Sequence, residues 1–158
     1  MPIAYVGVGS NLGDRAAWIA RARRELEAAG TARVIKEARL IETESAGGPP
    51  QPRYLNTCWE VETSLGPLEL LTALLETEAR CGRERSARWG PRTIDLDLLF
   101  YESIVLKTGR LALPHPRLAE RLFVLEPLHE LNPDFIHPVL GVDIHDLLLA
   151  AQRLGSCT

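Results

Sequence analysis

Hydrophobic residues along this chain recur at two spacings, and each spacing predicts one kind of element. Apolar, β-branched runs predict strands, and apolar positions three or four residues apart predict helices. Strands are predicted over 3–8, 34–43, 54–63 and 93–101, with two short candidates at 104–105 and 111–113. Helices are predicted over 15–29 and 67–80, with short helices near 118–128 and 143–154.

The ends of the two long helices carry residues that commonly start and stop helices. Asp14 precedes the first helix as an N-cap residue, and Pro67 suits the first position of the second. Gly30 and Gly82 follow their last residues, where glycine often ends a helix. Segment 47–52 contains three prolines and two glycines and is therefore predicted to be a loop.

The order of these elements predicts the fold class. Strand, helix, strand, strand, helix, strand is the order of a ferredoxin-like core, whose helices lie on one face of the sheet. We therefore expect an α+β fold with a mainly antiparallel sheet, helices packed on it, and C-terminal additions. Residues 1–158 are expected to form a single domain, because repeats, low-complexity tracts and linkers are missing.

Composition narrows the class of protein. Hydrophobic residues make up 46% of the chain and charged residues 25%, as in soluble globular proteins. The net charge of −3 creates no overall positive field that would attract nucleic acid. The three cysteines are widely spaced, which favours reduced thiols over a disulfide framework. A signal sequence and a membrane-spanning apolar run are both missing, so a cytoplasmic protein is predicted.

One short segment is positively charged, although the chain as a whole has a net charge of −3. From Arg80 to Arg92 five arginines accompany one glutamate, and Trp89 lies among them. Arginine presents a planar fork of donors that matches phosphate oxygens two at a time. The segment therefore suits a polyphosphate, and the simpler alternative is a solvated basic loop whose tryptophan packs on the core.

Two aspartates follow this segment on a predicted strand. Asp95 and Asp97 are two residues apart, so both side chains point to one face, with Cα atoms about 6–7 Å apart. Carboxylates at this spacing can hold Mg²⁺ together with substrate phosphates. Taken alone, the pair is more simply the acidic solvent face of an amphipathic strand. The adjoining arginines favour a metal-assisted transfer of a phosphoryl-type group.

Glycines near the amino terminus suggest a dinucleotide-binding turn, but their spacing is wrong. In Gly7-Val8-Gly9-Ser10-Asn11-Leu12-Gly13 the third glycine comes one position too late for the GxGxxG pattern. A Gly-Lys-Ser/Thr sequence does not occur, which excludes a Walker P-loop. We therefore interpret Gly7 and Gly9 as tight-turn glycines, and Asn11 as a residue that either lines a site or caps the turn.

Four motifs occur in order along nearly the whole chain. They are Gly9-Ser10-Asn11-Leu12-Gly13, Tyr54-Leu55-Asn56, Arg88-Trp89-Gly90-Pro91-Arg92-Thr93-Ile94-Asp95-Leu96-Asp97-Leu98 and Pro114-His115-Pro116-Arg117. Together they resemble the 6-hydroxymethyl-7,8-dihydropterin pyrophosphokinase family of folate biosynthesis. The resemblance implies that residues 1–158 are a single pyrophosphokinase domain. It also implies that this domain transfers diphosphate from ATP to the pterin hydroxymethyl group and releases AMP.

The resemblance also implies roles for particular residues. Asp95 and Asp97 would hold two Mg²⁺ ions, and Arg83 and Arg92 would be the catalytic residues at the polyphosphate. The residues expected to bind ATP are Arg85, Trp89, Arg110, His115 and Arg121. The residues expected to bind the pterin are Thr43, Ala46, Tyr54, Asn56 and Phe123.

Some of these positions have simpler alternatives. Glu78 matches an acidic position of the family, or is only a charge on the face of a helix. Phe123 lies in an apolar run and could be plain core packing. The sequence departs from the family after Thr43, where it reads Glu44-Ser45-Ala46-Gly47-Gly48 and many relatives carry proline. A general base for the pterin hydroxyl does not stand out.

Two other functions remain open at this point. A metal-dependent nucleotidyltransferase would attach AMP and release pyrophosphate. A nucleic-acid-binding module would use the arginine- and tryptophan-bearing loop, although the acidic net charge argues against it. The expected partners are ATP and the dihydropterin, with no nucleic acid and no membrane, and the expected state is a monomer. The length leaves no room for the aldolase or synthase domains that some relatives carry.

Overall fold

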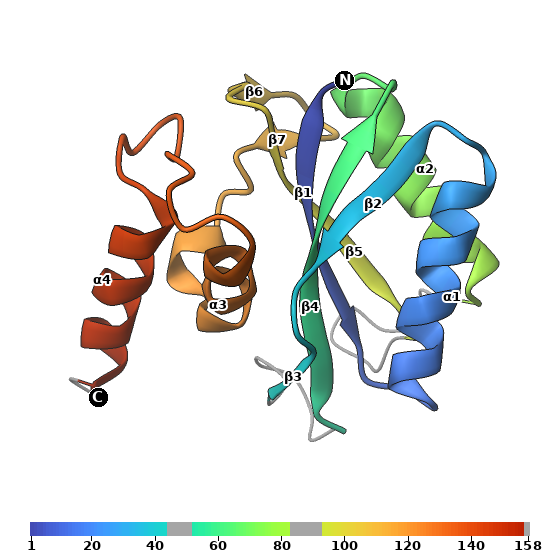
Figure 1. Cartoon of the computed structure of the whole chain (residues 1–158), viewed down its shortest axis with the longest axis horizontal. Coiled ribbons are helices and arrows are strands. Elements are labelled where there is room, and N and C mark those ends of the chain that lie inside the picture. The colour runs from blue at the N-terminus through green and yellow to red at the C-terminus, as the bar shows by residue number, and fades with distance from the viewer. Residues whose placement is uncertain (44–51, 83–92, 157–158) are drawn as a thin grey trace.

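The computed structural model describes residues 1–43, 52–82 and 93–156 of the 158-residue chain (Figure 1). The strands are β1 (Ile3–Ser10), β2 (Ala32–Glu37), β3 (Ile41–Thr43), β4 (Tyr54–Thr63), β5 (Asp95–Tyr101), β6 (Leu106–Lys107) and β7 (Ala112–Leu113). The helices are α1 (Arg15–Ala28), α2 (Pro67–Arg80), the short 3-10 helix η1 (Leu118–Glu120), α3 (Leu122–Leu131) and α4 (Ile144–Ser156).

The main sheet is antiparallel, and its strand order is β2-β4-β1-β5. The short strand β3 also pairs with β4, at the end where β4 begins. Helix α1 follows β1, and helix α2 follows β4, so the chain runs β1-α1-β2-β4-α2-β5 through the core. The β-α-β-β-α-β core and the mainly antiparallel sheet predicted from the sequence are therefore confirmed.

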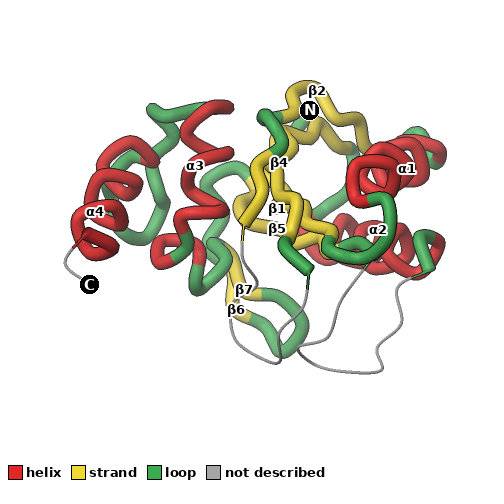
Figure 2. Tube along the Cα trace, turned by 90° about the horizontal axis from the view of Figure 1, so that it is seen from below, coloured by secondary structure: helices red, strands yellow, loops and turns green. Residues whose placement is uncertain are grey.

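Helices cover both faces of the sheet (Figures 1 and 2). Helices α1 and α2 lie on one face and α3 lies on the other, with α4 packed on the outer side of α3. Side chains of β1 alternate between the two layers, because Ala4 and Val6 join the core beneath α1 and α2, and Tyr5 joins the core beneath α3 and α4. The C-terminal additions thus form a third layer on the face that a ferredoxin-like core leaves open.

The residues predicted to start and stop the long helices do so. The Asp14 carboxylate accepts a hydrogen bond from the Ala17 N–H at 3.2 Å, which caps α1. Gly30 and Gly82 follow the two helices with φ angles of 75° and 73°, a region that favours glycine. No helix in the described ranges is both long and apolar enough to cross a bilayer.

Two strand predictions were wrong in their bounds. The single strand expected over 34–43 is two strands, because β2 ends at Glu37, β3 begins at Ile41, and residues 38–40 belong to neither. The short strand expected at 104–105 lies two residues later, because the Ile104 N–H bonds to the Tyr101 carbonyl in a turn. Short apolar runs predict a strand better than they predict where it begins.

Candidate active site

Three strands present their side chains in rows on the face opposite α1 and α2. Residues that face each other in an antiparallel ladder have side chains on the same face. The register gives a covered row of Phe100, Tyr5 and Glu60, a middle row of Asp97, Gly7 and Cys58, and an open row of Asp95, Gly9 and Asn56. Phe135 and His137, in the segment between α3 and α4, pack on the covered row, whereas Asp95 and Asp97 are half-buried. The two aspartates therefore share one face, as their spacing predicted.

Two glycines of β1 make room in the middle and open rows. Gly7 and Gly9 lie inside the strand, so their interpretation as tight-turn glycines was wrong. A Cβ atom at position 9 would lie 2.8 Å from the Asn56 side-chain oxygen and 3.3 Å from the Tyr54 ring. Glycine within a strand commonly marks such a close approach. The turn glycine is Gly13, whose φ is 71°.

Three of the residues expected at the pterin lie together at the start of β4. Thr43 pairs with Tyr54 across β3 and β4, and the Asn56 amide donates a hydrogen bond to the Thr43 hydroxyl. Asn56 is only 6% exposed, and its side-chain oxygen lies beside Gly9. We call Thr43, Tyr54 and Asn56 the amide cluster. An oriented amide beside an aromatic ring is suited to a flat heterocycle with a polar edge.

A buried carboxylate supports β5 between the two aspartates. Glu78 of α2 is 2% exposed and accepts a hydrogen bond from the Leu96 N–H at 2.8 Å. Because β5 is the edge strand of the main sheet, this outward N–H has no neighbouring strand to pair with. The alternative of a charge on the helix face was therefore wrong for Glu78. This bond fixes the backbone that carries Asp95 and Asp97.

The acidic pair has the donor type that a hard divalent cation prefers. Carboxylate oxygens suit Mg²⁺, which usually takes one or two of them and fills its remaining positions with water and substrate phosphates. No group of three or more His, Cys, Asp or Glu side chains that could hold a metal occurs in the described part of the chain. Asp95 and Asp97 are half-exposed and lie opposite two glycines of β1. They therefore suit a cation that binds together with a phosphorylated substrate.

His115 lies over β5 near the aspartates. The backbone N–H of His115 donates to the Leu99 carbonyl at 2.9 Å. Leu99 lies where the pairing of β5 with β1 shifts register. Burial lowers the pKa of His115, the positive charge of Arg121 lowers it further, and Asp95 opposes both. The Nδ1 atom accepts the Arg117 N–H at 3.3 Å, so the proton of the neutral ring is on Nε2.

Arg121 and Phe123 contact each other at the start of α3. The Arg121 guanidinium lies 5.7 Å from the centroid of the Phe123 ring. Phe123 is partly buried against the core beneath α3 and α4, so it packs on the core and also keeps part of its surface exposed. The positive charge of Arg121 contributes to the lowered pKa of His115, so the two side chains are electrostatically coupled.

Arg110 is in a different place from the other described site residues. It lies in the turn between β6 and β7, and its guanidinium donates to the Thr72 hydroxyl of α2 at 3.2 Å. In Figure 1 this turn is at the opposite end of β5 from Asp95. The structure does not bring Arg110 to the open row. Arg83, Arg85, Trp89, Arg92 and Ala46 lie outside the described residues, so their roles stay predictions.

Sequence reasoning gave no site role to Gly7, Gly9 or Arg15, and left the role of Asn11 undecided. Asn11 is 1% exposed, and its amide donates to the Pro52 carbonyl at 3.1 Å, so it contacts the chain just before the amide cluster. The contact joins residues 41 positions apart. Local turn patterns carry no signal for such a partner.

The fold matches solved structures described as HPPK-DHPS. The chain described as Plasmodium falciparum HPPK-DHPS wild type aligns with a TM-score of 0.75 and 16% identity, over 98% of this chain and 46% of that one. This chain therefore spans less than half of that protein, and the likeness concerns the fold. The fold is therefore that of a known class of α+β domain, and the carboxylate pair and the amide cluster lie on one face of its sheet.

The sequence comparisons identify the family. The family described as 7,8-dihydro-6-hydroxymethylpterin-pyrophosphokinase matches residues 5–133. The 2-amino-4-hydroxy-6-hydroxymethyldihydropteridine pyrophosphokinase of Bacillus subtilis is 43% identical over 129 residues, 82% of this chain and 77% of its own. The Aquifex aeolicus protein of the same name is 39% identical over 139 residues, 88% of this chain and 86% of its own. The chain belongs to the 7,8-dihydro-6-hydroxymethylpterin-pyrophosphokinase family.

Proposed function

We propose that this protein transfers the diphosphate of ATP to the hydroxymethyl group of 6-hydroxymethyl-7,8-dihydropterin in folate biosynthesis. Family membership supports the reaction. The arrangement of Asp95, Gly9 and Asn56 in the open row supports its location on the sheet. Asp95 and Asn56 flank Gly9 on either side, so their Cα atoms are two strand spacings apart, about 10 Å. A cation-binding group and a heterocycle-binding group at this separation suit two substrates that react with each other.

The transfer moves one group and one proton. The pterin hydroxyl oxygen forms a bond to the β-phosphorus of ATP, and the bond from that phosphorus to the oxygen bridging the α-phosphorus breaks. AMP leaves with the bridging oxygen, and the hydroxyl proton is lost to solvent or base. Positioning and charge neutralisation account for most of the catalysis of such transfers.

The chain's own residues divide between the two substrates. Asp95 and Asp97 would hold the two Mg²⁺ ions, and Glu78 keeps their strand in place through the Leu96 N–H. Bound Mg²⁺ would neutralise the charge on the ATP phosphates during transfer. His115 is neutral near pH 7 and donates from Nε2 to the nucleotide, beside the positive charge of Arg121. Arg83 and Arg92 are proposed for the polyphosphate, and Arg85, Trp89 and Arg110 for ATP, on the family pattern alone.

The amide cluster binds the pterin in this proposal. The Asn56 side chain is oriented by its bond to Thr43 and by the space over Gly9, so its oxygen can accept from the amino edge of the heterocycle. The rings of Tyr54 and Phe123 supply the apolar contact, and Ala46 joins them on the family pattern. Orientation before binding lowers the entropic cost of association.

A cytoplasmic monomer is also proposed, with ATP and the dihydropterin as its partners. Cys58 and Cys81 are buried free thiols, which suits a reducing compartment. The molar mass in solution, measured by light scattering with and without both substrates, tests the monomer. A stable dimer would contradict it.

Product analysis tests the reaction. The protein is incubated with Mg²⁺, ATP and the dihydropterin, and the products are separated and identified by ³¹P NMR. The proposal expects AMP and a pterin diphosphate in equal amounts, with turnover lost on chelation by EDTA and restored by Mg²⁺. Release of ADP would contradict the diphosphate transfer. Release of pyrophosphate with an adenylylated pterin would identify a nucleotidyltransferase.

A further inference from the structure

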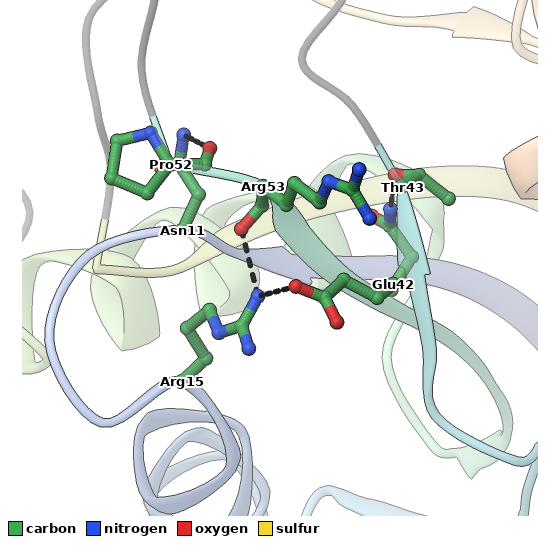
Figure 3. Close-up of polar contacts among 7 residues, drawn as sticks. Asn11, Arg15, Glu42, Thr43, Pro52 and Arg53 are labelled. Atoms are coloured by element: carbon green, nitrogen blue, oxygen red, sulfur yellow. Dashed lines mark hydrogen bonds and ion pairs between the residues drawn. The ribbon is translucent and has the colours of Figure 1, made fainter.

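An arginine at the start of α1 joins β3 to the residue that precedes β4. The Arg15 guanidinium donates to the Arg53 carbonyl at 2.9 Å and lies 3.3 Å from a carboxylate oxygen of Glu42 (Figure 3). Both contacts use the same nitrogen, Nη1. The Arg15 side chain is 29% exposed and that of Glu42 is 49% exposed, so solvent reaches both partners. One side chain thus holds two segments that are 11 residues apart.

The helix itself gives no reason for a cation at this position. The first turn of a helix carries a partial positive charge, which disfavours arginine there. Helix α1 has no acidic residue in its first turn that would compensate. The Asp14 carboxylate caps the helix, a role that the guanidinium of Arg15 cannot fill because it has no acceptor. The contacts that favour Arg15 lie outside α1, on β3 and on the residue that precedes β4.

Each residue that Arg15 holds is next to a member of the amide cluster. Glu42 directly precedes Thr43, and Arg53 directly precedes Tyr54. The amide of Asn11 donates to the Pro52 carbonyl, which adds a second tie one residue away (Figure 3). Movement of either strand end would change the position of the Thr43 hydroxyl that orients Asn56. The start of α1 and the turn before it therefore fix the spacing within the amide cluster.

We infer that Arg15 is a positioning residue for the pterin, acting through Thr43 and Tyr54. This inference rests on the proposed function of the amide cluster. The exposed ion pair with Glu42 alone would contribute little. The charge-assisted bond to the Arg53 carbonyl adds to it, because a charged donor makes a stronger bond than a neutral one. Arg15 is expected to affect binding of the pterin and not binding of the nucleotide, since its contacts lie at the β3–β4 end of the open row.

The variant Arg15→Leu removes both contacts and keeps a good helix former at the position. We expect its KM for the dihydropterin to rise about tenfold, which corresponds to about 1.4 kcal/mol. Its KM for ATP is expected to stay within about twofold and its kcat within about threefold, since Arg15 touches neither aspartate. Arg24→Leu, an exposed arginine on the same helix, is the matched control and should leave all three parameters unchanged.

Two further variants separate positioning from simple loss of structure. Arg15→Lys keeps the charge but offers a point charge in place of a fork, so a rise in KM of about threefold is expected. Glu42→Gln removes only the ion pair and should raise KM by about twofold. Should Arg15→Leu fail to fold, the lysine variant decides, and a wild-type KM in that variant would overturn the inference. Equal rises in both KM values would also overturn it, because they indicate general damage.

A direct binding measurement keeps this inference separate from the proposed function. Pterin fluorescence is titrated with wild type and Arg15→Leu in the presence of Mg²⁺ and an ATP analogue carrying a methylene bridge between the α- and β-phosphorus. About tenfold weaker binding by the variant supports the inference, and equal binding overturns it. A wild-type protein that binds the pterin but produces no AMP from ATP would instead contradict the proposed function.

Discussion

The covered row and the open row lie on the same face of the same three strands, but their side chains are used differently. In the covered row the Tyr5 hydroxyl donates to Glu60 at 2.7 Å and accepts from the Asn132 amide at 3.1 Å. Burial raises the pKa of Tyr5, and its bond to Glu60 raises it further. The open row lies four residues further along β1 than Tyr5. There Gly9 separates Asn56 from a half-buried Asp95.

The difference shows how the C-terminal helices create a site by covering only part of a face. Where α3 and the segment that follows it cover the sheet, polar groups must satisfy each other, because an unpaired buried group is costly. Where they do not, the Asp95 side chain is only half-buried and stays in contact with solvent. Strand β1, between β4 and β5, contributes a large side chain, Tyr5, to the covered row. It contributes only glycine to the middle and open rows.

Removing a carboxylate beside the open row should have the largest effect. Asp97→Ala is expected to lower kcat by about 1000-fold or more, as the loss of about 4 kcal/mol of transition-state stabilisation would. The midpoint of thermal unfolding should change little, because the side chain is half-exposed on an edge strand. Steady-state kinetics and calorimetry check both statements. Activity close to that of wild type would show that Asp97 is not a metal ligand.

A methyl group in the open row should disturb the amide cluster. Gly9→Ala places a Cβ atom 2.8 Å from the Asn56 oxygen, so that amide must move, and we expect the KM for the dihydropterin to rise about 30-fold. Gly7→Ala is the matched control, because its Cβ atom would lie 3.5 Å from Leu99, an ordinary contact. Kinetics with varied pterin concentration measure the pair. Equal effects of the two substitutions would contradict the role given to Gly9.

A substitution in the covered row should lower the stability of the fold and leave catalysis unchanged. Tyr5→Phe removes a hydroxyl that bonds both Glu60 and Asn132, and leaves two polar groups without this partner. We expect unfolding free energy to fall by about 1–3 kcal/mol. Urea unfolding measures the loss, and kcat is expected to stay within about twofold of wild type. A large fall in kcat with unchanged stability would break the contrast between the two rows.

Acid should weaken the layer above the covered row by a smaller amount. Burial lowers the pKa of His137, and its Nδ1 accepts the N–H groups of Val139 and Leu140 at 3.2 and 3.1 Å. The folded state therefore binds this proton less readily than the unfolded state. Its contribution to stability is complete above the unfolded pKa of about 6.5, and is lost as pH falls from there through the lower folded pKa.

The pH effect is measured as the difference between wild type and His137→Asn. Unfolding free energies at several pH values from 7.5 to 5 should fall more steeply for wild type, by at most about 1.4 kcal/mol per pH unit. The asparagine side chain can still accept the two N–H bonds but does not titrate. Parallel pH dependence of the two proteins would show that His137 makes no contribution.

The sequence predicted what depends on neighbours along the chain. Period-two spacing placed Asp95 and Asp97 on one face, and the capping pattern located α1. Contacts across strands carried no such signal. Gly9 was read as a turn residue because its neighbour Asn56 is 47 positions away. The buried role of Glu78 depends on the Leu96 N–H of an edge strand.

The position of the C-terminal helices also could not be predicted from their own pattern. The sequence predicted short helices there, but only the assembled structure shows that α3 packs on the second face and that α4 packs on α3. Arg110 illustrates the same limit, because its place in the β6–β7 turn brings it to Thr72 of α2. The family resemblance gave it a role that its described position beside α2 does not explain.

The fate of each phosphorus tests the central claim, that the open row supports diphosphate transfer between two substrates. Wild-type protein is supplied with Mg²⁺, the dihydropterin and ATP labelled separately at the α- or the β-phosphorus, and Asp97→Ala serves as the control. The account predicts that the β label moves to the pterin while the α label stays in AMP, and that Asp97→Ala moves neither. An α label on the pterin, or a β label that leaves as free pyrophosphate or stays in ADP, would contradict it.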